Sequence, residues 1–241
     1  MRTPKKSSVP YSNDQYFHNT RRQWAARCMG MNPMRFPLLV ILLSIGLLNT
    51  AQAETHENHF ASVLVRGKKI GQVHFTTTHN DEGVLQELRT RSTYSILGVE
   101  VYHHTMDVHE FWKGGEIQTL RANADNDGER YQSSLRREPT DYVGKLNEKP
   151  IELPLEAFPV AVWHYGIVEH SLLFNLPDLK LFRVKVVKSQ DSVTIGKQKI
   201  PAEKFTFSGD WKATIWFDHE RRFLKWTYKV MGVKVTVLLD P

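Results

Sequence analysis

From Phe60 onwards, apolar and polar residues alternate along most of the chain, as with Ala61, Val63 and Val65, and this pattern predicts β-strands. Gly, Asn and Asp cluster between the apolar stretches and supply the positive φ angles of tight turns, as in 113–116 and 125–128. Besides further strand segments around these two turns, we expect strands over residues 60–66, 70–79, 84–96, 99–113, 180–188, 192–195, 202–208, 212–218, 222–231 and 234–239.

The middle of the chain lacks this alternation. Residues 138–159 contain several prolines and few apolar pairs, so we expect a loop there. Residues 160–174 are the best helix candidate, with Pro159 placed for the first turn. Apolar residues cover more than one face of this segment, which predicts a short, largely buried helix that Gly166 weakens.

These elements predict a mainly β protein built as an antiparallel meander. About ten strands do not stay flat, because strand twist accumulates and exposed edges invite aggregation. We therefore expect a single curved antiparallel sheet or half-open β-barrel with one short helical segment. A barrel of that size encloses more space than its own side chains fill, so its interior has room for a small apolar ligand.

An apolar run over residues 36–48 precedes this domain and predicts a secretory signal peptide. Arg35 stands before the run, and small residues follow it up to Ala53, which places cleavage between Ala53 and Glu54. The run is shorter than the roughly 20 residues that span a membrane, although a buried core helix and an uncleaved anchor are alternatives. We expect a leader and signal peptide over 1–53 and one mature domain over 54–241. Translation from Met1 gives an unusually long basic n-region, and Met31 and Met34 are the alternative starts.

The predicted leader changes the charge and cysteine balance. The chain has 32 basic and 26 acidic residues, but residues 1–53 hold seven of the basic ones and one acidic one. The mature part is therefore neutral, and a nucleic-acid partner is not predicted. The single cysteine, Cys28, lies in the leader, so the mature domain forms no disulfide even in the periplasmic or secreted location that we predict.

Several short motifs resemble those of an uncharacterised family of exported bacterial proteins, a domain of unknown function. The motifs lie at 66–71 (RGKKIG), 102–104, 110–112, 123–130, 172–175, 215–218 and 223–224. The family is more distantly similar in fold to the LolA and LolB periplasmic lipoprotein carriers. The resemblance implies a curved antiparallel sheet wrapped around a helical segment, and it supplies no catalytic residues.

Histidines and a loop rich in Asn and Asp are candidate metal ligands. Asp107 and His109 share a strand face about 7 Å apart, whereas His103 lies about 20 Å from His109. A solvated strand face is the alternative for these residues. The segment 123–128 has the spacing of a calcium loop, but Ser134 stands where the loop needs a Glu, and a tight turn explains the same residues. We predict no cofactor.

Catalytic motifs are not found: the chain has no nucleophile elbow, catalytic cysteine or phosphate loop, so we do not predict an enzyme. Aromatic residues are abundant and form either a structural core or the wall of a ligand pocket. For the pocket, the candidate ligand-binding residues are Trp112, Trp163, His164, Tyr165, Phe174, Asn175, Trp216 and Trp226. The helical segment near Trp163 would then act as a plug or lid.

Two functions follow from this sequence. The first is a secreted or periplasmic protein, without a stable membrane anchor after cleavage, that binds or carries a hydrophobic small molecule or lipid. The second is a structural or assembly protein that docks an envelope partner through a sheet edge or an aromatic patch.

Overall fold

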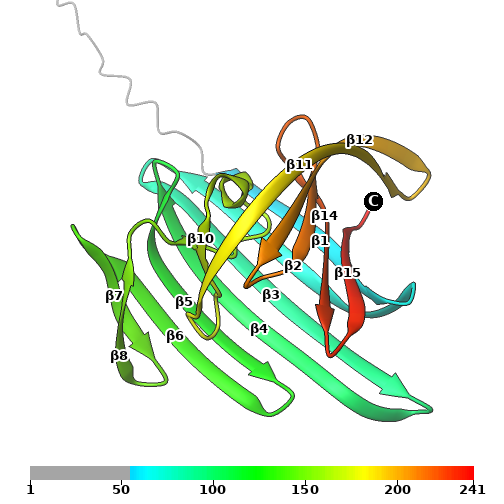
Figure 1. The fold of residues 1–241 in the computed structure, drawn as a ribbon, viewed down its shortest axis with the longest axis horizontal. Helices are drawn as coiled ribbons and strands as arrows, with labels where there is room; N and C mark the ends of the chain where they lie inside the picture. The colour runs from blue at the N-terminus through cyan, green and yellow to red at the C-terminus, as the bar shows by residue number, and fades with distance from the viewer. Residues whose placement is uncertain (1–54) are drawn as a thin grey trace, which may run out of the picture. The chain divides into compact units, whose positions relative to one another are not determined.

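A single large curved sheet forms most of the protein. The computed structural model describes residues 55–241, which lie within one compact unit, Thr50–Pro241. Within these residues the sheet has 15 strands in the order β8-β7-β6-β5-β4-β3-β2-β1-β15-β14-β13-β12-β11-β10-β9. Figure 1 shows the long strands from β2 to β6 side by side in this order. The predicted leader and its cleavage site lie outside the described residues.

Successive strands pair in antiparallel fashion from β1 to β8 and from β10 to β15. The N-terminal half contains β1 (Thr55–Val65), β2 (Lys68–Asn80), β3 (Gly83–Ile96), β4 (Val99–Lys113), β5 (Glu116–Asn126), β6 (Glu129–Arg137), β7 (Asp141–Leu146) and β8 (Lys149–Pro154). The C-terminal half contains β9 (Phe158–Pro159), β10 (Leu172–Phe174), β11 (Leu181–Ile195), β12 (Gln198–Gly209), β13 (Ala213–Phe217), β14 (Phe223–Val230) and β15 (Val233–Leu239). Pairing of β1 with β15, in which Val63 faces Val237, joins the two halves.

Alternation along each strand divides the sheet into an inner and an outer face. On β4 the buried residues Val108, Glu110 and Trp112 point inward, and residues between them are more exposed. The inner side chains of both halves form one apolar core. Irregular pairing at Val63/Leu64, Phe111/Trp112 and Trp216/Phe217 interrupts the strand register, and such bulges bend strands.

The open, curved, antiparallel sheet confirms the predicted fold class, but the predicted number of about ten strands is wrong. Residues 138–159 are not a loop, since they contain β7, β8 and β9. Prolines occur here because β8 ends the sheet, and an edge strand tolerates residues that lack a backbone N–H. The strands predicted at 180–188 and 192–195 are one continuous strand, β11.

The predicted short helical segment is present, but it fills only part of its candidate range. Of residues 160–174, only Tyr165–Glu169 is helical, as the 3₁₀ helix η1, and Leu172–Phe174 is β10. Pro159 lies in β9, which pairs in parallel with β10, and therefore does not start the helix. Within residues 55–241 the structure contains no helix with the length and apolar character to cross a bilayer.

Candidate ligand-binding site

The segment between β9 and β11 packs against the inner face of the sheet. Trp163 lies 5.7 Å from Phe75 of β2, measured between ring centroids, and Phe158 lies 5.5 Å from Trp112 of β4. The Ser133 hydroxyl on β6 donates a 3.0 Å hydrogen bond to the Leu176 carbonyl. This segment therefore contacts strands far from it in the sequence and occupies the hollow side of the curved sheet.

A cavity of about 270 Å³ remains between this segment and the sheet. Its wall is mostly apolar and aromatic, formed by Val63, Val73, Phe75, Leu88, Met106, Ala124, Val160, Val162, Trp163, Leu176, Pro177, Trp226, Tyr228, Val230 and Val237. Polar side chains complete the lining: Thr90, Ser92, Tyr102, His104, Asn126, Tyr131, Asn175 and Asp178. An apolar cavity with a few polar groups is the usual composition of a small-molecule site.

The polar part of the lining carries little charge. Tyr102 donates a 2.6 Å hydrogen bond to Asn126, and Asn175 donates a 2.8 Å hydrogen bond to Asp178. Burial lowers the pKa of His104, which favours its neutral form. A hydrogen bond with the Glu129 carboxylate raises the pKa of Tyr131 to about 12, so this phenol stays neutral. Asp178 is then the one charged group in the lining, and it is negative.

Three buried nitrogen atoms of lining residues have no hydrogen-bond partner among residues 55–241: His104 Nδ1, Trp163 Nε1 and Trp226 Nε1. An indole nitrogen only donates, and a buried donor without an acceptor is unfavourable by about 1–3 kcal/mol. All three belong to residues that line the same cavity. The nitrogens themselves are buried behind the cavity surface, and the Trp163 indole lies close enough to the Glu110 carboxyl to influence its pKa.

Glu110 is a buried carboxyl group on the inner face of β4, beside this wall. It is fully buried, and the Trp112 indole donates a 2.9 Å hydrogen bond to Glu110 Oε2. Desolvation raises its pKa to about 8, although the indoles of Trp112 and Trp163 act in the opposite direction. Trp163 Nε1 and Glu110 Oε1 still lack a hydrogen bond in the described structure. Glu110 is therefore mostly protonated at neutral pH.

The sequence-predicted site residues fall into three groups. Trp163, Asn175 and Trp226 line the cavity. Trp112, Tyr165 and Phe174 belong to the surrounding core, and His164 packs on Trp112; none of these four residues lines the cavity. Trp216 lies in a separate apolar cluster with Val193, Ile195, Ala202 and Leu224.

The predicted residues outside the cavity wall contact other parts of the protein and not the cavity. His164 stacks on Trp112 at 4.5 Å, and its Nδ1 accepts a 3.0 Å hydrogen bond from the Gly166 backbone N–H. Tyr165 donates a 3.0 Å hydrogen bond to Glu203 on β12. The Trp216 indole donates a 3.0 Å hydrogen bond to Asp191. These residues therefore fix η1 and the C-terminal strands in place.

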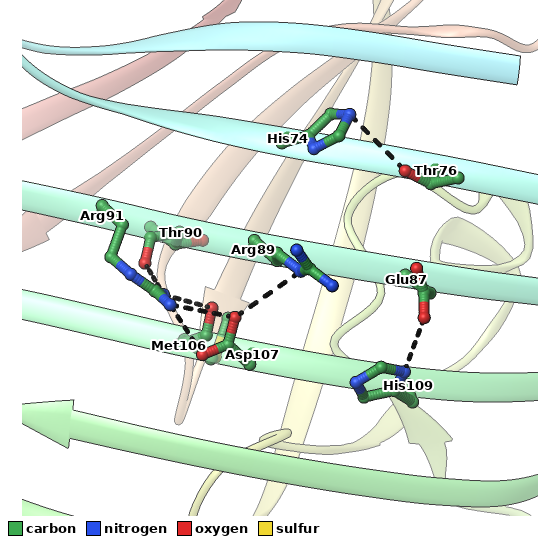
Figure 2. A network of polar contacts seen from close by, with 9 residues as sticks. All are labelled: His74, Thr76, Glu87, Arg89, Thr90, Arg91, Met106, Asp107 and His109. Atoms are coloured by element: carbon green, nitrogen blue, oxygen red, sulfur yellow. Dashed lines mark hydrogen bonds and ion pairs between the residues drawn. The ribbon is translucent and has the colours of Figure 1, made fainter.

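The candidate metal ligands Asp107 and His109 bind different partners on the outer face, as Figure 2 shows. Asp107 accepts two hydrogen bonds from Arg91, at 2.9 and 3.2 Å. His109 Nδ1 lies 2.9 Å from a Glu87 carboxylate oxygen. The two side chains thus belong to separate cross-strand pairs, as the solvated-face interpretation predicts.

Residues 123–128 form the end of β5 and the turn into β6. Asp125 accepts a 2.8 Å hydrogen bond from the Gly128 backbone N–H, and Asp127 and Gly128 have positive φ angles of 56° and 91°. These are the features of a two-residue hairpin turn. The turn interpretation of this segment is therefore confirmed.

Most of the cavity lining was not predicted from the sequence, and His104 in the lining and the nearby Glu110 are the two unpredicted polar residues for which the sequence carries a signal. Both lie on the face of the β4 range that also carries Val108 and Trp112. A histidine and a glutamate at the alternate positions that point into the core indicate a candidate site, because an inward-facing polar group in a strand requires a hydrogen-bond partner or a function.

Comparisons with known proteins give a family and a fold. Residues 62–240 match the family model described as "Domain of unknown function (DUF6134)". No curated protein matches the sequence. The chain is similar to the crystal structure of a beta-barrel-like protein of domain of unknown function DUF1849 from Brucella abortus, with a TM-score of 0.54 and 11% identity over 76% of this chain and 94% of that chain. This likeness shows the fold alone.

Proposed function

Since the chain belongs to the DUF6134 family, a domain of unknown function, we propose its role from its own cavity: it binds and carries a hydrophobic small molecule or lipid. The observation that carries this proposal is an apolar cavity lined by three residues whose buried nitrogens lack partners. We propose binding rather than catalysis. The predicted leader supports a periplasmic or secreted location, and the similarity to lipoprotein carriers stays a prediction.

The lining also favours one class of ligand. Asp178 is the charged residue of the lining, and the described lining offers no Lys or Arg to pair with an anionic head group. Burial of an unpaired carboxylate is strongly unfavourable. Indole N–H groups instead suit neutral acceptors such as ester or ketone oxygens. The volume is slightly below that of typical ligand pockets, so the ligand is a short acyl chain or one end of a longer lipid.

Displacement of a neutral fluorescent probe, N-phenyl-1-naphthylamine, tests this proposal. We expect monocaprin, a neutral ester, to displace the probe at a concentration roughly tenfold lower than caprate, which has the same acyl chain and a carboxylate. Equal displacement by both would contradict the neutral-head proposal. Absence of any probe binding would contradict the carrier function itself.

A cavity-filling substitution provides the second test. Ala124 lines the cavity from β5, so Ala124→Phe should occupy much of its volume and weaken probe binding by about tenfold or more. Asn123→Phe is the matched control, because it adds the same side chain next to Ala124 on the outer face. The two variants are compared by probe titration, with circular dichroism as the check on folding. If Ala124→Phe bound the probe with wild-type affinity, the probe would bind outside this cavity.

The second function predicted from the sequence, docking of an envelope partner, stays a prediction. An aromatic patch is not favoured, because Phe60 is the one aromatic among the strongly exposed large apolar side chains of residues 55–241. Phe60 also stacks on His74 at 4.4 Å.

A further inference from the structure

Three hairpin turns lie next to one another at the end of the sheet near the polar part of the cavity. The turns are β1–β2 (Arg66-Gly67), β3–β4 (Leu97-Gly98) and β14–β15 (Met231-Gly232), and the strand order β4-β3-β2-β1-β15-β14 places them side by side. Figure 1 shows the β3–β4 and β14–β15 turns along its lower right edge. We call these three turns and their flanking residues the docking rim.

Apolar side chains on the docking rim are exposed to solvent. Leu97 is 99% exposed and Met231 is 86% exposed, the two highest values among the large apolar residues of 55–241. Ile96, Val99 and Val101 beside Leu97 are exposed as well. Solvent-exposed apolar side chains gathered at one end of a protein indicate an interaction site.

Leu97 and Met231 are also unusual residue types for the backbone conformation that they adopt. Leu97 and Met231 have φ angles of 52° and 47°, a conformation that favours Gly, Asn or Asp. The neighbouring β5–β6 and β7–β8 turns carry Asp127 and Asn147 at the equivalent position. Folding alone would favour the same choice at Leu97 and Met231, so their apolar side chains require another explanation.

The β3–β4 hairpin also extends past the end of its pairing with β2 and with β5. Pairing of β3 with β2 ends at Ser92 opposite Gly71, and pairing of β4 with β5 ends at His104 opposite Asn126. The tip from Thr93 to Tyr102 is therefore outside both ladders, and the Asp127 backbone N–H still donates a 2.9 Å hydrogen bond to the His103 carbonyl at its base. Five residues, or about 16 Å of extended chain, separate Ser92 from Leu97, whereas β2 continues four residues from Gly71 to the turn at Gly67.

Basic side chains lie on two of the three hairpins of the rim, β1–β2 and β14–β15. Arg66, Lys68, Lys229 and Lys234 are exposed and form no ion pair with the residues that the structure describes, and Lys69 lies 3.9 Å from Asp240. Acidic residues lie beside the β3–β4 hairpin: His103 is 3.4 Å from Glu100 and also 3.1 Å from Asp125 and 3.5 Å from Asp127 of the neighbouring hairpin. Exposed apolar residues combined with unpaired cations complement a membrane surface that contains anionic lipids.

We propose that the docking rim binds reversibly to an anionic lipid surface, with Leu97 and Met231 inserted between head groups and the Lys and Arg side chains of the rim on the phosphates. Tyr102, Tyr228 and Val230 line the cavity and lie on the same hairpins, so docking brings the cavity close to the lipid. The proposal does not depend on what the cavity holds.

Vesicle co-sedimentation of the purified protein tests this proposal. We expect binding to vesicles of phosphatidylcholine with phosphatidylglycerol as the minor lipid, weaker binding to phosphatidylcholine alone, and loss of binding at high salt. Leu97→Asn combined with Met231→Asn should lower the partition coefficient by about tenfold or more. Because Asn suits a positive φ angle, this double variant should keep or raise the unfolding temperature.

Two controls make the outcome specific. Val187→Thr removes an exposed apolar side chain on β11, away from the rim, and should leave vesicle binding unchanged. Ala124→Phe blocks the cavity and should also leave it unchanged, which separates this proposal from the carrier function. Failure of the wild-type protein to bind anionic vesicles, or wild-type binding by the double variant, would overturn the proposal in favour of a protein partner.

Discussion

Replacement of Glu110 by Gln should remove a pH dependence of folding on the order of 5 kcal/mol. Desolvation raises the pKa of this fully buried carboxyl from 4.5 to about 8. Between these two pH values the unfolded chain has lost the proton that the folded protein retains. The free energy of unfolding therefore falls by about 1.4 kcal/mol per pH unit as pH rises through this window, and it is highest below pH 4.5 as far as Glu110 is concerned.

Gln keeps the shape of Glu and accepts the Trp112 hydrogen bond, but it does not ionise. The stability of the Glu110→Gln variant relative to wild type should therefore increase steadily from pH 4.5 to pH 8 and stay constant above it. Urea unfolding at a series of pH values measures this difference. Burial lowers the pKa values of His104 and His164, so these two residues make the free energy of unfolding rise with pH, opposite to the effect of Glu110. Their contribution is the same in both proteins and cancels when the variant is compared with the wild type.

Glu152→Gln is the matched control, because Glu152 is an exposed carboxylate on β8. In this variant the free energy of unfolding should depend on pH as it does in the wild type. If Glu110→Gln also showed the wild-type pH dependence, Glu110 would be equally charged in the folded and unfolded states. The core around Trp112 and Trp163 would then have to contain a compensating cation or water.

Local patterns predicted the hairpins well because hairpins depend on neighbouring residues. The predicted range 99–113 has the same bounds as β4, and Asp127-Gly128 forms the expected turn. The prediction failed where tertiary position decides the outcome. Pro150 and Pro154 argue against a strand in isolation, but β8 pairs on one side only and tolerates them.

The candidate site was harder to predict than the strands. Trp163, Asn175 and Trp226 were chosen for residue type and do line the cavity, whereas Trp216, chosen in the same way, packs in the separate cluster. Only the strand order and curvature decide which tryptophans face the same space. The alternation along β4 places His104 and Glu110 on the same face as its buried residues. The position of a residue on the inner or outer face of its strand therefore predicts the site better than its residue type does.

Trp163→Ala should lower the free energy of unfolding by about 3 kcal/mol and also abolish probe binding. Trp163 packs on Phe75 at 5.7 Å and lines the cavity, so its removal enlarges the cavity and deletes one wall. This loss is at the low end for a truncated aromatic residue because the side chain is only partly buried. Urea unfolding and probe titration measure the two effects.

Trp163→Phe separates packing from ligand contact at this position. Phe retains an aromatic ring against Phe75 but lacks the indole N–H, which has no partner in the described structure. Because Trp163 Nε1 has no hydrogen-bond partner among the described residues, Trp163→Phe should lose only the packing of the larger ring while weakening the binding of monocaprin by about threefold to tenfold. If Trp163→Phe instead lost more stability than the packing of the larger ring provides and bound monocaprin normally, the indole N–H would serve the buried Glu110 carboxyl, and the neutral acceptor of the ligand would bind at His104 or Trp226.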